Sequence, residues 1–137
     1  DKQQPLPTYL HKLGDDRKND VFLGSPKDAK NSFYIYDNRY GDVTFFGESD
    51  FYSNTLRIKK TGTMDPGKII YSSAKYRAYP EVIGDKMYIL TNDNAPNYKL
   101  LTGDTKNPDS KNWKVLIPES NTVIEDYSVT KYNIIVM

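Results

Sequence analysis

Cysteine is absent from this chain of 137 residues, and histidine occurs once, as His11. Without cysteine the chain can form no disulfide and can use no thiolate as nucleophile or metal ligand. The absence fits an oxidising or a reducing compartment equally well, so localisation stays open between cytoplasm and periplasm. A triad of serine, histidine and carboxylate could be built only around His11.

An excess of charge of one sign is also lacking, since 19 basic and 18 acidic residues give a net charge of +1. Such a balance provides no field that would attract nucleic acid or an acidic membrane surface. No apolar run approaches the roughly 18 residues of a membrane-spanning helix, and no signal peptide opens the chain. We therefore expect neither nucleic acid nor membrane as a partner, and Asp1 and Met137 look like points at which a longer protein was divided.

What the chain does contain is aromatic residues in short runs. Hydrophobic content is only 37%, but 12 Tyr, 5 Phe and 1 Trp argue against disorder. Stretch 79–117 holds four runs rich in Tyr, Ile, Val and Thr, and turn-forming residues separate them; the runs are 79–83, 87–91, 98–101 and 113–117. No window keeps apolar residues at helical spacing over a dozen positions. This pattern predicts a four-stranded antiparallel sheet of the size of one propeller blade.

An earlier stretch repeats this unit, with runs at 32–36, 42–46, 55–58 and 68–71. Gly41 and Gly84 lie 43 positions apart at the first turn of each unit, and Asn54 and Asn97 lie 43 apart before the third run. This period falls among the roughly 40 to 50 residues of blade repeats. The sequence therefore predicts an all-β partial β-propeller of stacked four-stranded antiparallel blades. Its divisions are the second half of a blade (1–27), two complete blades (32–72 and 78–118) and the first half of another (123–137).

Two strings carry a resemblance to a known family. LTNDNAPNYKL, followed after about a dozen residues by NWKVLIPE, resembles the propeller domain of prolyl oligopeptidases, the serine peptidases also called prolyl endopeptidases. PTYLHKLGDDRKNDVFLG and TVIEDYSVTKYNIIVM resemble an earlier strand pair and the opening of the following blade. The resemblance implies partners for this chain, namely the catalytic α/β-hydrolase domain of a parent chain and short proline-containing peptides.

Candidate catalytic and metal sites are few. The string around His11 matches a propeller strand of the family, and not its catalytic histidine, so we expect a structural role. Ser49 in Gly47-Glu48-Ser49-Asp50-Phe51 lacks the second glycine and the following helix of a nucleophile elbow. The oxygens of 92–94 could bind calcium, although turn-forming Asn and Asp usually bond their own backbone. We expect no catalytic residue, no metal and no cofactor here, and no peptide hydrolysis by this chain alone.

One loop, 48–53, is a candidate for contact with substrate. In prolyl oligopeptidases the loop between the second and third strands of a blade faces the cavity shared with the catalytic domain, and the family places an Arg and a Cys there. Residues 48–53 contain neither. Phe51 and Tyr52 could present an apolar wall to a peptide, and the alternative is an ordinary exposed loop.

Two functions remain open. The first is a non-catalytic part of the gating propeller of a prolyl oligopeptidase, which in the whole enzyme admits short peptides to the active site. The second is a self-standing β-rich module that binds a peptide or glycan. A self-standing module should consist of whole blades, and the predicted blades at the two ends of this chain are incomplete. This favours the first function. We also expect the isolated chain to self-associate, because the apolar run 133–137 forms an open strand edge. In the strand that Trp113 opens, we expect Leu116 to be covered.

Overall fold

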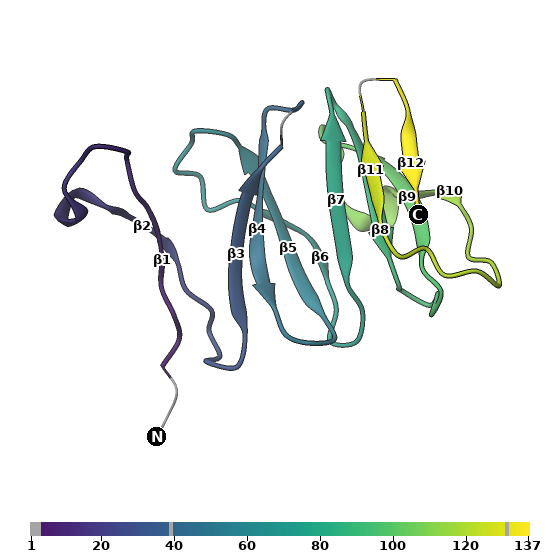
Figure 1. Ribbon diagram of the computed structural model, residues 1–137, viewed down its shortest axis with the longest axis horizontal. Coiled ribbons are helices and arrows are strands. Elements are labelled where there is room, and N and C mark those ends of the chain that lie inside the picture. Colours follow the sequence, from purple (N-terminus) through teal and green to yellow (C-terminus); the bar gives the residue numbers. More distant parts are fainter. Residues whose placement is uncertain (1–3, 39, 131) are drawn as a thin grey trace.

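The computed structural model describes residues 4–38, 40–130 and 132–137, and these form four antiparallel sheets side by side (Figure 1). Sheet 1 contains β1 (Thr8–Leu10) and β2 (Val21–Gly24). Sheet 2 contains β3 (Ser32–Asp37), β4 (Val43–Ser49), β5 (Asn54–Lys60) and β6 (Lys68–Ser72). Sheet 3 contains β7 (Ala78–Ile83), β8 (Lys86–Thr91), β9 (Lys99–Asp104) and β10 (Lys114–Ile117). Sheet 4 contains β11 (Tyr127–Val129) and β12 (Ile134–Val136).

Each strand pairs with the next one along the chain, so every sheet is a meander. The helical elements in the described residues are two single 3-10 turns, η1 (Arg17–Asn19) and η2 (Ser110–Asn112). Sheets 2 and 3 meet where the turn after β3 reaches the end of β7, as the parallel bridge between Tyr40 and Ile83 shows. The predicted all-β class and the stacked four-stranded antiparallel sheets are confirmed.

The two glycines of the predicted repeat lie where the first turns of sheets 2 and 3 meet. Gly84 begins the two-residue turn between β7 and β8 with a φ of 59°, a conformation that glycine adopts without steric cost. Its N–H donates to the carbonyl of Tyr40 at 2.7 Å. A Cβ on Gly41 would lie only 2.6 Å from Cγ1 of Val82. Gly41 therefore allows close contact between the sheets, whereas an added Cβ on Gly84 would meet nothing within 4 Å and this glycine serves the conformation of the turn.

Sheet 3 is buried on both faces. Met87 and Ile89 of β8 are fully buried against sheet 2, where they meet Phe45 and Leu56. Leu90 points to the opposite face and belongs to a second cluster with sheet 4, formed with Leu100, Ile124, Tyr127 and Val129. Successive residues of a strand alternate between faces, so β8 supplies both clusters. Each fully buried side chain of this kind contributes about 1.5–3 kcal/mol.

Side chains of one sheet hydrogen-bond the main chain of the next. The amide of Asn54 accepts from the N–H of Ala78 at 2.9 Å and donates to the carbonyl of the same residue at 2.8 Å. The hydroxyl of Tyr36 donates to the carbonyl of Pro80 at 3.0 Å. The hydroxyl of Tyr127 lies within hydrogen-bonding distance of the carbonyls of Tyr79 (2.7 Å) and Tyr88 (2.8 Å). Pro80 lies within β7, and it is tolerated because β7 is an edge strand.

A related contact recurs between successive sheets. Oδ1 of Asn38 accepts from the N–H of Val82 at 3.0 Å, and Oε2 of Glu81 accepts from the N–H of Val129 at 3.0 Å. Burial raises the pKa of the Glu81 carboxyl; the Val129 hydrogen bond opposes this shift, and the charge of Asp126 adds to it. Folding therefore shifts the Glu81 carboxyl toward its neutral form relative to the unfolded chain.

Trp113 is half-buried and directly precedes β10. Its ring stacks on Tyr71, with centroids 5.8 Å apart, and its indole N–H donates to the carbonyl of Pro108 at 2.9 Å. The expectation that Leu116 is covered is wrong, because Leu116 is 40% exposed and Val115 is 58% exposed. A register shift in the β10–β9 pairing, between Val115 and Ile117, breaks the alternation at Leu116.

Replacing Glu81 by glutamine tests the contact between sheets 3 and 4. Because the pKa of Glu81 is raised in the folded state, protonated Glu81 stabilises the fold. This stabilisation is complete below the unfolded pKa of about 4.3 and is lost as pH rises through the folded pKa. Glutamine keeps an oxygen acceptor for Val129 and carries no charge. We expect Glu81→Gln to raise the Tm at neutral pH and to leave it unchanged in acid, as measured by thermal denaturation.

Glu125→Gln removes an exposed carboxylate and controls for net charge. A Tm for Glu81→Gln at neutral pH equal to or below that of the unchanged chain would contradict this reading.

Replacing Trp113 by alanine removes the stacking on Tyr71. Removing a fully buried aromatic side chain lowers the free energy of unfolding by about 3–5 kcal/mol. Trp113 is only half-buried, so we expect a smaller loss, of about 2 kcal/mol. Trp113→Phe keeps a ring on Tyr71 but loses the bond to Pro108, so we expect a loss of about 1 kcal/mol. Urea denaturation measures both. Equal losses would show that ring stacking contributes nothing.

Candidate functional site

The loop between β4 and β5 contains the predicted substrate-contact residues and lies at the end of the sheets that is lowest in Figure 1. Its turn is organised by Asp50, whose Oδ1 accepts from the N–H groups of Tyr52 at 2.7 Å and Ser53 at 2.6 Å. These two backbone hydrogen bonds lower the pKa of the Asp50 carboxyl. An aspartate that bonds the backbone two and three residues ahead is a common reason for a chain to turn. The linker between β6 and β7 passes at the same end.

Phe51 and Tyr52 extend outward from this turn. Their side chains are 79% and 69% exposed, and their rings meet edge to face with centroids 4.9 Å apart. Both therefore lie where the sequence predicted, in the loop joining the second and third strands of a sheet. An exposed aromatic pair of this kind provides contact area for a partner or ligand.

Arg77, in the linker before β7, joins this pair to sheet 3. Its guanidinium lies over the ring of Phe51, 6.0 Å from the centroid. Nη1 donates to the hydroxyl of Tyr79 at 3.0 Å, and Nη2 donates to the carbonyl of Asp50. Its Nε is buried and has no hydrogen-bond partner within the described part of the chain. Phe51, Tyr52, Arg77 and Tyr79 together are called the aromatic shelf.

A hollow of about 330 Å³ adjoins the aromatic shelf between β3 and β7 and is lined by Tyr34, Tyr36, Ser49, Asn54, Arg77, Ala78 and Tyr79. Burial raises the pKa of Tyr34 and Tyr36 far above the usual tyrosine range, so both stay protonated. Their hydroxyls donate to the carbonyls of Thr55 at 2.7 Å and Pro80 at 3.0 Å. The hollow thus offers aromatic walls and one cation, and no pair of groups suited to acid–base chemistry.

Of the other sequence candidates, His11 lies beside sheet 1, whereas Ser49 lines the hollow beside the aromatic shelf. His11 follows β1, and its Nδ1 lies 2.6 Å from Oδ1 of Asp20 across sheet 1. Ser49 is the last residue of β4 and is paired with Ser32 and Asn54. A strand followed by a turn and another strand differs from the strand-turn-helix of a nucleophile elbow. Neither residue is arranged as a catalytic group.

The polar loop 92–94 uses its oxygens within the protein. Asn92 Oδ1 accepts from the N–H of Arg77 at 2.8 Å, and Asp93 Oδ1 accepts from the amide of Asn94 at 2.8 Å. Among the described residues no group of three or more His, Cys, Asp or Glu side chains could hold a metal ion. No helix in that part of the chain is long and apolar enough to cross a membrane.

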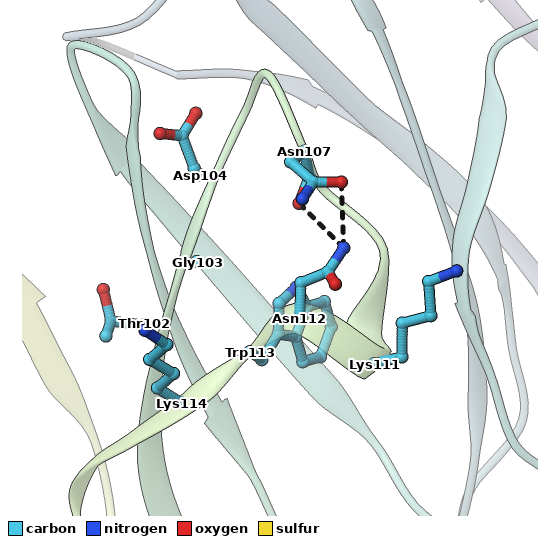
Figure 2. Close-up of a pocket in the computed structure, with 8 residues that line it drawn as sticks. All are labelled: Thr102, Gly103, Asp104, Asn107, Lys111, Asn112, Trp113 and Lys114. Carbon is cyan, nitrogen blue, oxygen red and sulfur yellow. Dashed lines mark hydrogen bonds between the residues drawn. The ribbon is translucent and has the colours of Figure 1, made fainter.

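A larger hollow, of about 660 Å³, lies around η2 between β9 and β10. Figure 2 shows Asn107 and Asn112 facing each other, with Lys111 pointing away from them. The amide of Asn112 donates to Oδ1 of Asn107 at 2.9 Å, and a Cβ on Gly103 would lie 2.8 Å from the Trp113 ring. These groups bond and pack with one another, so we assign the hollow to the structure of the loop.

Sequence reasoning found Phe51 and Tyr52 but missed Arg77 and the tyrosines beside it. Arg77 lies in a linker without periodic pattern, 26 positions after Phe51. Tyr34, Tyr36 and Tyr79 resemble every other strand tyrosine in the sequence. No local motif therefore indicated that Arg77 and Tyr79, which belong to the start of sheet 3, lie beside Phe51.

Comparison with known proteins supports the architecture. The family model described as the prolyl oligopeptidase N-terminal β-propeller domain matches residues 3–137. A prolyl endopeptidase of Elizabethkingia meningoseptica is 29% identical over 122 residues, which are 85% of this chain and 17% of that protein. A prolyl oligopeptidase of Omphalotus olearius is 26% identical over 134 residues, again 17% of its length. The chain thus spans about a sixth of the relatives it matches.

Solved structures show the same fold. A prolyl endopeptidase structure superposes with a TM-score of 0.85 at 19% identity, covering 93% of this chain and 19% of that one. Prolyl oligopeptidase B from Galerina marginata superposes with a TM-score of 0.80 at 16% identity, covering 99% and 20%. The predicted partial β-propeller and the resemblance are confirmed, and the chain belongs to the prolyl oligopeptidase N-terminal β-propeller family.

Proposed function

We propose that this chain is part of a gating propeller which, in the whole enzyme, covers a catalytic α/β-hydrolase domain and admits short proline-containing peptides to it. The match of the family model over residues 3–137 supports this proposal. The relatives named above are prolyl peptidases, and one structural neighbour was described for the role of inter-domain dynamics in catalysis and specificity. The catalysis itself would belong to the other domain, since this chain offers only His11, bonded to Asp20.

The aromatic shelf is the feature of the structure that supports contact with a peptide. Phe51 and Tyr52 expose most of their ring surface, and the Arg77 cation lies over one of the rings. Aromatic surfaces bind proline rings well, because both are rigid and largely apolar and little conformational entropy is lost. The guanidinium can in addition donate to peptide carbonyls or to a terminal carboxylate.

Alanine substitutions in the whole enzyme test this role. We expect Phe51→Ala and Tyr52→Ala each to raise the KM for a short proline-containing peptide by about fivefold, because an aromatic contact contributes about 1 kcal/mol. The kcat should stay unchanged, since the aromatic shelf binds ground state and transition state alike. Steady-state kinetics on that peptide provides both constants.

Met64→Ala is a matched control, because Met64 is 79% exposed, as Phe51 is, and lies in the β5–β6 loop at the opposite end of sheet 2. If Phe51→Ala and Tyr52→Ala behave like Met64→Ala, the aromatic shelf does not contact the substrate. Saturable binding of the same peptide by residues 1–137 alone would instead favour a self-standing peptide-binding module.

A further inference from the structure

The hollow beside the aromatic shelf lies between the two complete sheets, 2 and 3. Its lining residues come from β3, from β4 and β5 next to their joining loop, and from the start of sheet 3, and all lie between positions 34 and 79. Its volume of about 330 Å³ is at the lower end of the range for ligand pockets, roughly 300–1,000 Å³. The hollow is therefore suited to the end of a peptide and not to a folded partner.

Arg77 gives this hollow a positive charge that no carboxylate pairs with in the described part of the chain. The ion pairs found there involve other residues. Asp50 is close enough for the charge of Arg77 to help lower the pKa of its carboxyl. However, Oδ1 of Asp50 accepts from the N–H groups of Tyr52 and Ser53, and Arg77 bonds the main-chain carbonyl of Asp50. A half-buried guanidinium thus lines the hollow without an anionic partner.

The guanidinium is held in position before any ligand binds. Nη1 donates to the hydroxyl of Tyr79, and Nη2 donates to the carbonyl of Asp50. The main chain of Arg77 is fixed as well, because its N–H donates to Oδ1 of Asn92 at 2.8 Å and its carbonyl accepts from the hydroxyl of Thr91 at 2.6 Å. An arginine has five N–H donors, and the side-chain bonds use two of them. Little ordering is therefore needed when an acceptor binds.

The other walls of the hollow offer no partner for a bound cation. Tyr34 and Tyr36 stay protonated, and their hydroxyls donate to main-chain carbonyls. The amide of Asn54 is bonded to the main chain of sheet 3, and Ser49 adds a hydroxyl that can donate. A carboxylate would meet Arg77 with Ser49 as a further donor, and an apolar side chain beside that carboxylate would meet aromatic rings. These are the two features of a peptide that ends in an apolar residue.

We propose that Arg77 binds the C-terminal carboxylate of a short peptide, whose last side chain occupies the hollow between β3 and β7. Nε is buried, so the second N–H groups of Nη1 and Nη2 face the ligand. A charge-assisted hydrogen bond is about twice as strong as one between neutral groups, which favours the chain end over an internal peptide carbonyl. This inference rests on the peptide contact proposed above and deepens it, because it names peptides with a free carboxyl end as the substrates.

Peptides with a free C-terminal carboxylate, compared with the same peptides as C-terminal amides, test this in the whole enzyme. The series varies the number of residues after the cleaved proline and keeps an apolar last residue. At one length we expect the KM of the acid to be about tenfold below that of the amide, as a charge-assisted hydrogen bond provides, with a smaller difference at other lengths. The kcat should be the same for both, since the carboxylate is bound in ground state and transition state alike.

Arg77→Gln completes the comparison at that length. Glutamine removes the charge and keeps an amide that can donate to Tyr79. We expect the acid and the amide to have equal KM values in this variant. Arg17→Gln is a matched control, because Arg17 is exposed and lies in the β1–β2 loop, at the opposite end of the sheets in Figure 1. It should keep the tenfold preference for the acid.

Equal KM values for acid and amide at every length would overturn the inference, and this comparison requires no variant to fold. A preference for the acid that persists in Arg77→Gln, or one that disappears in Arg17→Gln, would overturn it as well. Failure of the proposed function gives a different result, in which Phe51→Ala and Tyr52→Ala leave the KM unchanged for both forms of the peptide. A raised KM in these two variants, together with equal values for acid and amide, would keep the peptide contact and remove the carboxylate site.

Discussion

The structure depends on face-to-face packing of neighbouring sheets, because no sheet here has a core of its own. Phe45 and Leu56 of sheet 2 share one buried cluster with residues of sheet 3, and Leu90 and Leu100 of sheet 3 share a second with residues of sheet 4. A four-stranded sheet leaves two broad faces, and strand pairing covers neither. Stability is therefore shared between neighbours, as in other repeat architectures in which one unit alone cannot bury its apolar face.

The polar contacts between sheets solve a second problem, the open edges of β7 and β11. Both are edge strands, and their outward backbone groups need partners. Side chains of the neighbouring sheet provide them: Asn54 bonds both backbone groups of Ala78, and Tyr36 bonds the carbonyl of Pro80. Tyr36 and Tyr127 show why tyrosine suits these contacts between sheets. Tyrosine adds apolar area and at the same time ends in a donor that reaches the next main chain.

Much of this could be predicted from the sequence, because strands and turns have local signals. Gly84 marks a two-residue turn, and the 43-residue spacing of Asn54 and Asn97 reflects similar positions, each bonded to the linker that follows its sheet. The partners of Asn54 and Arg77 were not predictable, since they lie on neighbouring sheets. Leu116 was predicted wrongly because a register shift changes which face a side chain occupies, and no residue type announces it. The proposed division of the ends into half-blades stays a prediction.

Native-state hydrogen exchange at three backbone amides tests most directly the central claim that neighbouring sheets are one cooperative unit. The amides of Ala78, Val82 and Val129 each donate to a side chain of the neighbouring sheet. The account predicts that they exchange with the same opening free energy as amides within the sheets, because the sheets open together. Rapid exchange at these three amides, while the amides within the sheets stay protected, would show independent sheets and contradict it.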